Sequence, residues 1–425
     1  MYALERAPET EIDNGLLRFL TCGSVDDGKS TLIGRLLLDS KSILADTLHA
    51  ITRTSEKRGL SAVDLSLLTD GLMAEREQGI TIDVAYRYFS TGTRKYIIAD
   101  APGHEQYTRN MVTAASTANL AVILVDARKG ILTQTRRHSF IAHLVGIPHL
   151  VIAINKMDLV GWSRDVFERL QAEYVDFARK LGIADARFVP ISALTGDMVV
   201  DRGQRLGWYD GPTLLDILEA APAAHTERAE KFRFPVQYVC RPQTPEHHDF
   251  RGYMGQVESG EIAVGDEVQV LPSGLKTRVK AIRIHDQALQ RATSEQSVTL
   301  LLEDDIDIGR GDMIVRPGDP PVVTRQVDAM VCWLGDAPLV PQRKYILRHT
   351  TREARAAIAS IDYRVDVNEL VHMPAERLAM NDIGRVTFKL AQPIFADPYQ
   401  ESRATGAFII IDEATHDTVG AGMIR

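Results

Sequence analysis

The chain has 425 residues, of which 45% are hydrophobic and 25% charged, and its 49 Lys and Arg against 57 Asp and Glu give a formal net charge of -8. This length and composition indicate a soluble globular protein of roughly two to four domains and argue against broad affinity for nucleic acid. The N-terminus has neither a cationic start nor an apolar stretch, and no apolar run reaches the length of about 18 residues that a membrane span needs. The 3 cysteines lie far apart without metal-ligand spacing, so we expect a cytoplasmic protein with reduced thiols, no signal peptide and no membrane span.

Strand-like and helix-like segments alternate from Leu16 to about Ala224. The expected strands are LLRFLT from Leu16, VAYRYFS from Val84, KYIIAD from Lys95, LAVILVDA from Leu120, HLVIAINKMD from His149 and FVPISAL from Phe188. Amphipathic stretches such as RDVFERLQAEYVDFARKLG, with apolar residues three or four apart, separate most of them. This alternation predicts an α/β domain over 1–224, with a mainly parallel sheet and helices on both faces.

The pattern changes after the linker-like segment EAAPAAHTERAE. From Phe232 onward, short alternating runs are punctuated by glycine, with turns roughly every 8 to 12 residues, which predicts small antiparallel β-barrels. The segment RPGDPPVV contains Pro317, Pro320 and Pro321, which would interrupt any sheet, so we place a boundary there. The predicted barrel domains are therefore 232–320 and 321–425.

A phosphate-binding loop is predicted near the N-terminus. GSVDDGKS, from Gly23 to Ser30, follows an apolar run and precedes a stretch with helical spacing of its leucines. In such a loop the backbone N–H groups converge on phosphates, Lys29 reaches the β and γ oxygens, and the Ser30 hydroxyl is offered to Mg²⁺. The alternative is an ordinary glycine turn that opens a helix, but the strand, loop and helix order favours a nucleoside triphosphate site.

A threonine in the following loop is a candidate Mg²⁺ ligand. The segment EREQGITID runs from Glu75 to Asp83, and the Thr81 hydroxyl is suited to bind the ion while its N–H bonds the γ-phosphate. In isolation a polar loop threonine would be the simpler interpretation; the flanking GIT and the downstream DAPGH favour the functional one.

The DAPGH segment lies at the end of a predicted strand. Asp100 there can hold Mg²⁺ directly or through water, and Gly103 lets its N–H approach the γ-phosphate. His104 follows Gly103, where hydrolysis needs a group that orients water in line with the leaving oxygen. Val25 and Ile80 could exclude stray water until His104 turns inward. The alternatives are a charged strand end and a structural histidine.

The NKMD segment, Asn155 to Asp158, identifies the base. The Asp158 carboxylate can accept hydrogen bonds from N1–H and the 2-amino group of guanine, whereas adenine would leave it unpaired at a cost of about 1 to 3 kcal/mol or more. Asn155 would bridge the base and the phosphate loop, and the stem of Lys156 would lie along the ring. Backbone N–H groups of SAL, Ser192 to Leu194, could meet guanine O6. The sequence therefore predicts GTP rather than ATP.

These motifs assign catalytic roles to His104, Lys29 and Thr81. They assign Mg²⁺ binding to Ser30, Thr81 and Asp100, the last possibly through water. The predicted nucleotide-binding residues are Gly23, Ser24, Val25, Asp26, Asp27, Gly28, Lys29, Ser30, Thr31, Asp100, Ala101, Pro102, Gly103, His104, Asn155, Lys156, Met157, Asp158, Ser192, Ala193 and Leu194.

Together, GSVDDGKS, GIT, DAPGH, NKMD and SAL resemble the translation-factor class of GTPases, in which the water-positioning residue is histidine. The two predicted barrels are similar to the second and third domains of that class. Longer stretches, including DGLMAEREQGITIDVAYRYFST, FRGYMGQVESG and TGAFIIIDEATHDTVGAGMI, resemble the large GTP-hydrolysing subunits of bacterial sulfate adenylyltransferase. Elongation factors typically carry histidine at the position of Asp27, whereas the sulfate-assimilation subunits have the paired acids seen at Asp26 and Asp27.

The resemblance implies a heteromeric enzyme in which GTP hydrolysis on this chain drives formation of adenosine 5'-phosphosulfate and pyrophosphate from ATP and sulfate. It implies that a separate small subunit, subunit 2, performs the adenylyl transfer. Some relatives continue into a kinase domain; because this chain ends at GAGMIR, we expect that activity to be absent. The alternatives are a GTP-dependent carrier of aminoacyl-tRNA and a GTP-switched interaction protein, because the nucleotide motifs serve all three equally.

Overall fold

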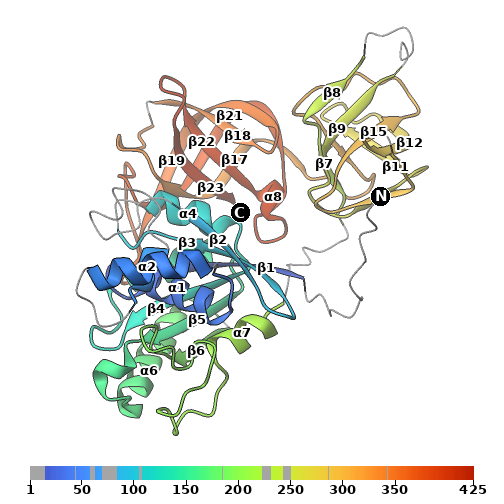
Figure 1. Cartoon of the computed structure of the whole chain (residues 1–425). Helices are drawn as coiled ribbons and strands as arrows, with labels where there is room; N and C mark the ends of the chain where they lie inside the picture. The colour runs from blue at the N-terminus through green and yellow to red at the C-terminus, as the bar shows by residue number, and fades with distance from the viewer. Residues whose placement is uncertain are drawn as a thin grey trace, which may run out of the picture. The chain divides into compact units, whose positions relative to one another are not determined.

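The structure, a computed structural model, describes residues 15–43, 45–57, 63–68, 84–104, 108–183, 185–222, 231–242, 250–285, 287–341 and 343–425. The chain divides into two compact units, Met1–His225 with Val367–Leu370, and Thr226–Asp366 with Val371–Arg425 (Figure 1). Within the described ranges, none of the helices combines the length and the apolar character that a membrane crossing requires.

The first unit is built on a 6-stranded sheet in the order β2-β3-β1-β4-β5-β6. Its strands are β1 (Leu16–Gly23), β2 (Ala85–Ser90), β3 (Lys95–Asp100), β4 (Leu120–Asp126), β5 (His149–Asn155) and β6 (Ala186–Pro190). The β2–β3 pair is antiparallel, and all the other neighbours are parallel. The predicted strands and the mainly parallel sheet are therefore confirmed.

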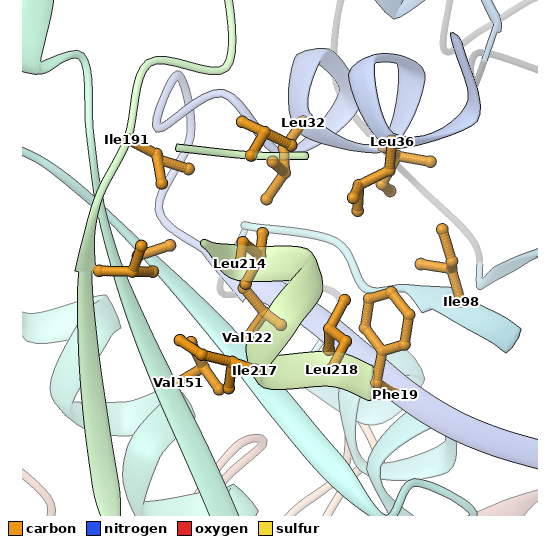
Figure 2. Packing of buried hydrophobic residues seen from close by; sticks show 14 of the residues in the cluster. Phe19, Leu32, Leu36, Ile98, Val122, Val151, Ile191, Leu214, Ile217 and Leu218 are labelled. Atoms are coloured by element: carbon orange, nitrogen blue, oxygen red, sulfur yellow. The ribbon is translucent and has the colours of Figure 1, made fainter. Parts of the chain in front are cut away.

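Helices cover both faces of this sheet. The helices of this unit are α1 (Lys29–Asp39), α2 (Ala45–Lys57), α4 (Thr108–Ser116), α5 (Thr133–Leu144), α6 (Arg164–Leu181) and α7 (Leu214–Ala220), with the short 3₁₀ turns η1 (Leu65–Leu68) and η3 (Met157–Val160). Figure 2 shows Leu32 and Leu36 of α1 and Leu218 of α7 gathered over Phe19 and Val122 of the sheet. Because side chains alternate along a strand, the neighbouring β-strand residues point to the opposite face, where α5 packs against β1 and β4.

The carboxyl ends of the parallel strands bring the predicted motifs to one edge of the sheet. Gly23 ends β1, Asp100 ends β3, and Asn155 ends β5. Asp126 ends β4, between β1 and β5. In open α/β sheets this edge is where ligands bind, so the fold itself assembles the candidate site from segments far apart in the sequence.

The second unit is antiparallel throughout its sheets. One sheet has the order β7-β16-β11-β12-β15-β9-β8, with β13 paired to β12, and a small sheet pairs β10 with β14. A third sheet has the order β18-β22-β23-β17-β21-β19-β20, and an additional β18–β19 pairing closes β17, β18, β19, β21, β22 and β23 into a ring. The strands of the first barrel are β7 (Arg233–Pro235), β8 (Tyr238–Cys240), β9 (Gly252–Gln256), β10 (Glu261–Ala263), β11 (Glu267–Leu271), β12 (Lys276–Ile284), β13 (Gln287–Leu289), β14 (Arg291–Thr293), β15 (Ser297–Leu302) and β16 (Met313–Val315). The second barrel contains β17 (Val322–Trp333), β18 (Lys344–His349), β19 (Arg352–Asp366), β20 (Val371–Met373), β21 (Ile383–Ala396), the short α8 (Arg403–Gly406), β22 (Ala407–Asp412) and β23 (Thr418–Ile424). The predicted fold class, an α/β domain followed by antiparallel barrels, is confirmed.

A buried ion pair joins residues of the two barrels inside the second unit. The Arg233 guanidinium donates from Nε and Nη2 to the two carboxylate oxygens of Asp397, at 2.8 and 2.9 Å. Thr405 Oγ1 donates to the same carboxylate at 2.6 Å. Burial alone would raise the pKa of Asp397, but these hydrogen bonds hold it below its usual range. The pair therefore stabilises the fold above the pKa of an unfolded aspartate, and this contribution is lost as the pH falls through the lower, folded pKa.

Replacing Asp397 with Asn should destabilise the second unit by about 3 kcal/mol or more, because the buried Arg233 charge then has no counter-charge. Urea unfolding of the full chain, with hydrogen exchange to locate the transition, measures the loss. Asp417→Asn, at an exposed turn, is the matched control and should change stability by less than about 0.5 kcal/mol. Equal stability of the two variants would contradict the assigned role of the ion pair.

Candidate nucleotide-binding site

The loop from Gly23 to α1 has the shape of a phosphate cradle. Gly28 caps α1 in the left-handed conformation, at φ 96°, and a Cβ atom there would lie 2.5 Å from Asn155 Nδ2. The Ser24 N–H donates to Asp27 Oδ2 at 2.6 Å, which closes the loop on itself. Glycine is thus required at position 28 by both backbone conformation and space.

Lys29 lies where this loop meets the DAPGH segment. Its Nζ donates to the carbonyl oxygens of Gly23 and Ser24, each at 3.0 Å, and a Cβ on Gly103 would come within 2.5 Å of the same Nζ. Burial lowers the pKa of Lys29, and the nearby charges of Asp100 and Asp27 oppose that effect. The ammonium is therefore held at the floor of the cradle with carboxylates close enough to favour its charged form.

A cavity of about 310 Å³ opens above the loop. Its lining residues are Val25, Asp26, Gly28, Lys29, Ser30, Thr31, Ser66, Gly103, His104 and Lys156. Two lysines, the start of α1 and two glycines that let the backbone approach closely are the donor set that phosphate groups require. These residues fit the phosphates of a nucleotide.

The DAPGH segment supplies one wall of this site. Thr21 and Asp100 are register partners of β1 and β3, and the Thr21 hydroxyl donates to Asp100 Oδ1 at 3.3 Å. Ala101, Pro102 and Gly103 are buried, whereas His104 is exposed and lines the cavity. A hydroxyl at Ser30 and a carboxylate at Asp100 are oxygen donors of the kind that Mg²⁺ prefers.

Asn155 ties the phosphate loop to the segment predicted to meet the base. Its Nδ2 donates to the Asp27 carbonyl at 2.7 Å, and its Oδ1 accepts the Ala193 N–H at 2.9 Å. Within the protein, Asn155 therefore links the loop to the SAL segment, whereas its predicted contact with the base stays a prediction. The Ala193 N–H, one of the donors predicted for guanine O6, is thus already engaged by Asn155.

Sequence reasoning missed Asp126, which helps to hold Lys156. Lys156 Nζ donates to the Asp26 carbonyl of the loop and lies 3.0 Å from Asp126 Oδ2. Asp126 also accepts from Arg128 Nε at 3.0 Å and Nη2 at 2.7 Å. Burial alone would raise the pKa of Asp126, but the hydrogen bonds from Arg128 and Lys156 outweigh it and hold that pKa well below the usual range. The only sequence signal was an acidic residue at the end of a buried strand.

Ser66 is a second residue that the sequence did not reveal. It lies in η1, lines the cavity, and its hydroxyl donates to Asp64 Oδ1 at 2.6 Å. Its neighbours form the apolar run LSLL, which gives no hint of a ligand site.

Some of the remaining predicted residues are described by the structure, and others lie outside the described residues. Met157 is buried in η3, Asp158 follows it half-buried, and Leu194 is exposed beyond the buried Ser192. Thr81 and Ile80 lie outside the described residues. The catalytic, metal and base-reading roles assigned to individual residues stay predictions.

Family models match both units of the chain. Residues 14–223 match the elongation factor Tu GTP binding domain, and residues 326–425 match the GTP-eEF1A C-terminal domain-like family.

Relatives that match almost the whole chain define its family more narrowly than the domain models do. Sulfate adenylyltransferase subunit 1 of Cellvibrio japonicus is 56% identical over 411 residues, which cover 96% of this chain and 86% of the relative. The same subunit of Alteromonas mediterranea is 54% identical with the same coverage. The bifunctional enzyme CysN/CysC of Mycobacterium tuberculosis is 53% identical over 96% of this chain and 67% of that relative. The chain belongs to the sulfate adenylyltransferase subunit 1 family, and its first domain is a GTP-binding domain of the elongation factor Tu type.

Proposed function

We propose that this chain is the GTP-hydrolysing subunit of a heteromeric sulfate adenylyltransferase, in which GTP hydrolysis drives the conversion of ATP and sulfate to adenosine 5'-phosphosulfate and pyrophosphate. The Asn155 side chain, which joins the phosphate loop to the SAL segment, supports the guanine-nucleotide part of the proposal. The observation that carries the sulfate adenylyltransferase part is the similarity to named relatives. Relatives that are 52% to 56% identical bear the name of this enzyme's subunit 1.

Adenylyl transfer would take place on a separate small subunit. The name "subunit 1" of the relatives implies a subunit 2, and the motifs of this chain account for one nucleotide site. The proposed division of labour places GTP here and ATP with sulfate on the partner.

In the proposed mechanism, Lys29 and the N–H groups at the start of α1 bind the β- and γ-phosphates. Ser30, Thr81 and Asp100 would hold Mg²⁺, and the ion would supply positive charge that offsets the charge of the phosphates. The Gly103 N–H orients the γ-phosphate, and His104, exposed at the cavity, positions water in line with the leaving oxygen. Burial of Lys29 strengthens its interaction with the charge that develops in the transition state.

The alternative of a carrier for aminoacyl-tRNA shares every nucleotide motif. The relatives favour the sulfate enzyme over this alternative, because they match along 96% of the chain and carry the enzyme's name. Filter binding of charged tRNA in the presence of GTP separates the two, since tight binding would support the carrier.

GTP hydrolysis by the chain should be stimulated by the small subunit together with ATP and sulfate. The reason is that, in a coupled enzyme, GTP is hydrolysed when the adenylyl transfer reaction proceeds. The rate of phosphate release is measured with each component omitted in turn. Turnover that is indifferent to ATP and sulfate would instead support a GTP-switched interaction protein.

Asp158→Asn should lower affinity for GDP by about 10-fold or more and raise affinity for xanthosine diphosphate, because the donor and acceptor pattern at the base inverts. Equilibrium titration with both nucleotides measures the change. Asp165→Asn, exposed at the start of α6, is the matched control. Unchanged GDP affinity would refute the base-reading role.

His104→Ala should slow GTP hydrolysis by about 100-fold while GTP affinity changes less than about 2-fold, since the residue acts on water rather than on the bound nucleotide. Single-turnover hydrolysis and nucleotide titration separate the two effects. His49→Ala, exposed on α2, serves as control. If turnover survives in His104→Ala, another group positions the water.

A further inference from the structure

A side chain of α1 is hydrogen-bonded to the SAL segment. Arg35 Nε donates to the Ala193 carbonyl at 3.2 Å, and Arg35 Nη2 donates to the Leu194 carbonyl. The same guanidinium lies 3.5 Å from Asp39 Oδ1, one helical turn further along α1. A planar guanidinium that bonds two successive carbonyls fixes the orientation of both peptide groups.

The orientation of one of these peptides decides which donor faces a base. The carbonyl of Ala193 and the N–H of Leu194 belong to the same planar, trans peptide unit and point in opposite directions. Since Arg35 binds that carbonyl, the Leu194 N–H points away from α1. The preceding N–H, that of Ala193, is already donated to Asn155 Oδ1. Among the described residues, the Leu194 N–H has no acceptor in the hydrogen-bond network of this segment.

We propose that Arg35 is a positioning residue of the base site, which holds the Ala193–Leu194 peptide so that the Leu194 N–H donates to O6 of guanine. The inference rests on the proposed function in that it takes guanine as the base. It adds a structural link between the SAL segment and the phosphate cradle, because Arg35 lies on α1, whose first turn forms part of the cradle. The SAL segment and the phosphate loop are thus joined twice, by the Asn155 side chain and by Arg35 through α1.

The test pairs a protein change with a ligand change at one atom. Binding of GDP and of 6-thioguanosine diphosphate is measured for the full chain; the second nucleotide keeps N1–H and the 2-amino group but replaces O6 with sulfur, a weak acceptor. The original chain should prefer GDP. In Arg35→Met we expect GDP affinity to fall by about 10-fold and the preference for GDP over the thio analogue to shrink by about 5-fold, the coupling expected when both changes remove one hydrogen bond.

Two further variants keep the test decisive. Arg35→Lys retains the charge but cannot bond two carbonyls with a planar fork, so it should lose part of the preference for GDP over the thio analogue. This variant also provides the test if Arg35→Met does not fold. Asp39→Asn removes the ion pair of Arg35 and leaves its two carbonyl bonds, so its nucleotide preference should match that of the original chain.

The outcomes separate this inference from the proposed function. Equal losses for GDP and the thio analogue in the Arg35 variants, no loss for either, or no preference for GDP in the original chain would overturn the positioning role. GDP that binds no better than ADP to the original chain would overturn the guanine site itself, and with it the proposed function.

Discussion

The two hydrogen bonds of the Asn155 side chain are the constraint on which the site depends. One amide holds the Asp27 carbonyl and the Ala193 N–H, so this single side chain fixes the phosphate loop relative to the SAL segment. The space beside Gly28 is set by the same amide, since a Cβ would lie 2.5 Å from it. A buried amide with both ends engaged is costly to disturb, because breaking either bond leaves a polar group unpaired.

The fold of the first unit could be read from the sequence because its signals are local. Buried parallel strands such as β4 appear as continuous apolar runs, and the glycine loop after β1 marks its own helix. The barrels were recognisable from turn spacing, but their strand order was not, because pairings such as β17 with β21 join residues far apart in the chain. Register between distant strands depends on the whole packed sheet rather than on any short segment.

The candidate site was likewise predictable only where its signals were local in the sequence. Residues inside motifs were found, whereas the side chains that hold those motifs were not. Arg35 and Ala193 are 158 positions apart, and Asp126, which ends β4, pairs with Lys156, which follows β5. Arg35 sits among apolar residues at ordinary helical spacing, so its sequence context is that of any partly exposed helix position. Only the folded sheet reveals that these charged groups serve the nucleotide segments.

The closed ring of the second barrel gives its last strand an unusual importance. β23, Thr418–Ile424, lies between β17 and β22 in the ring and is hydrogen-bonded to both. A chain shortened by this one strand would expose two hydrogen-bonding edges at once and open the core that contains Trp333 and Phe408. The pairings of this one strand therefore decide whether the sheet is a closed barrel or an open sheet with two free edges on which another chain could pair.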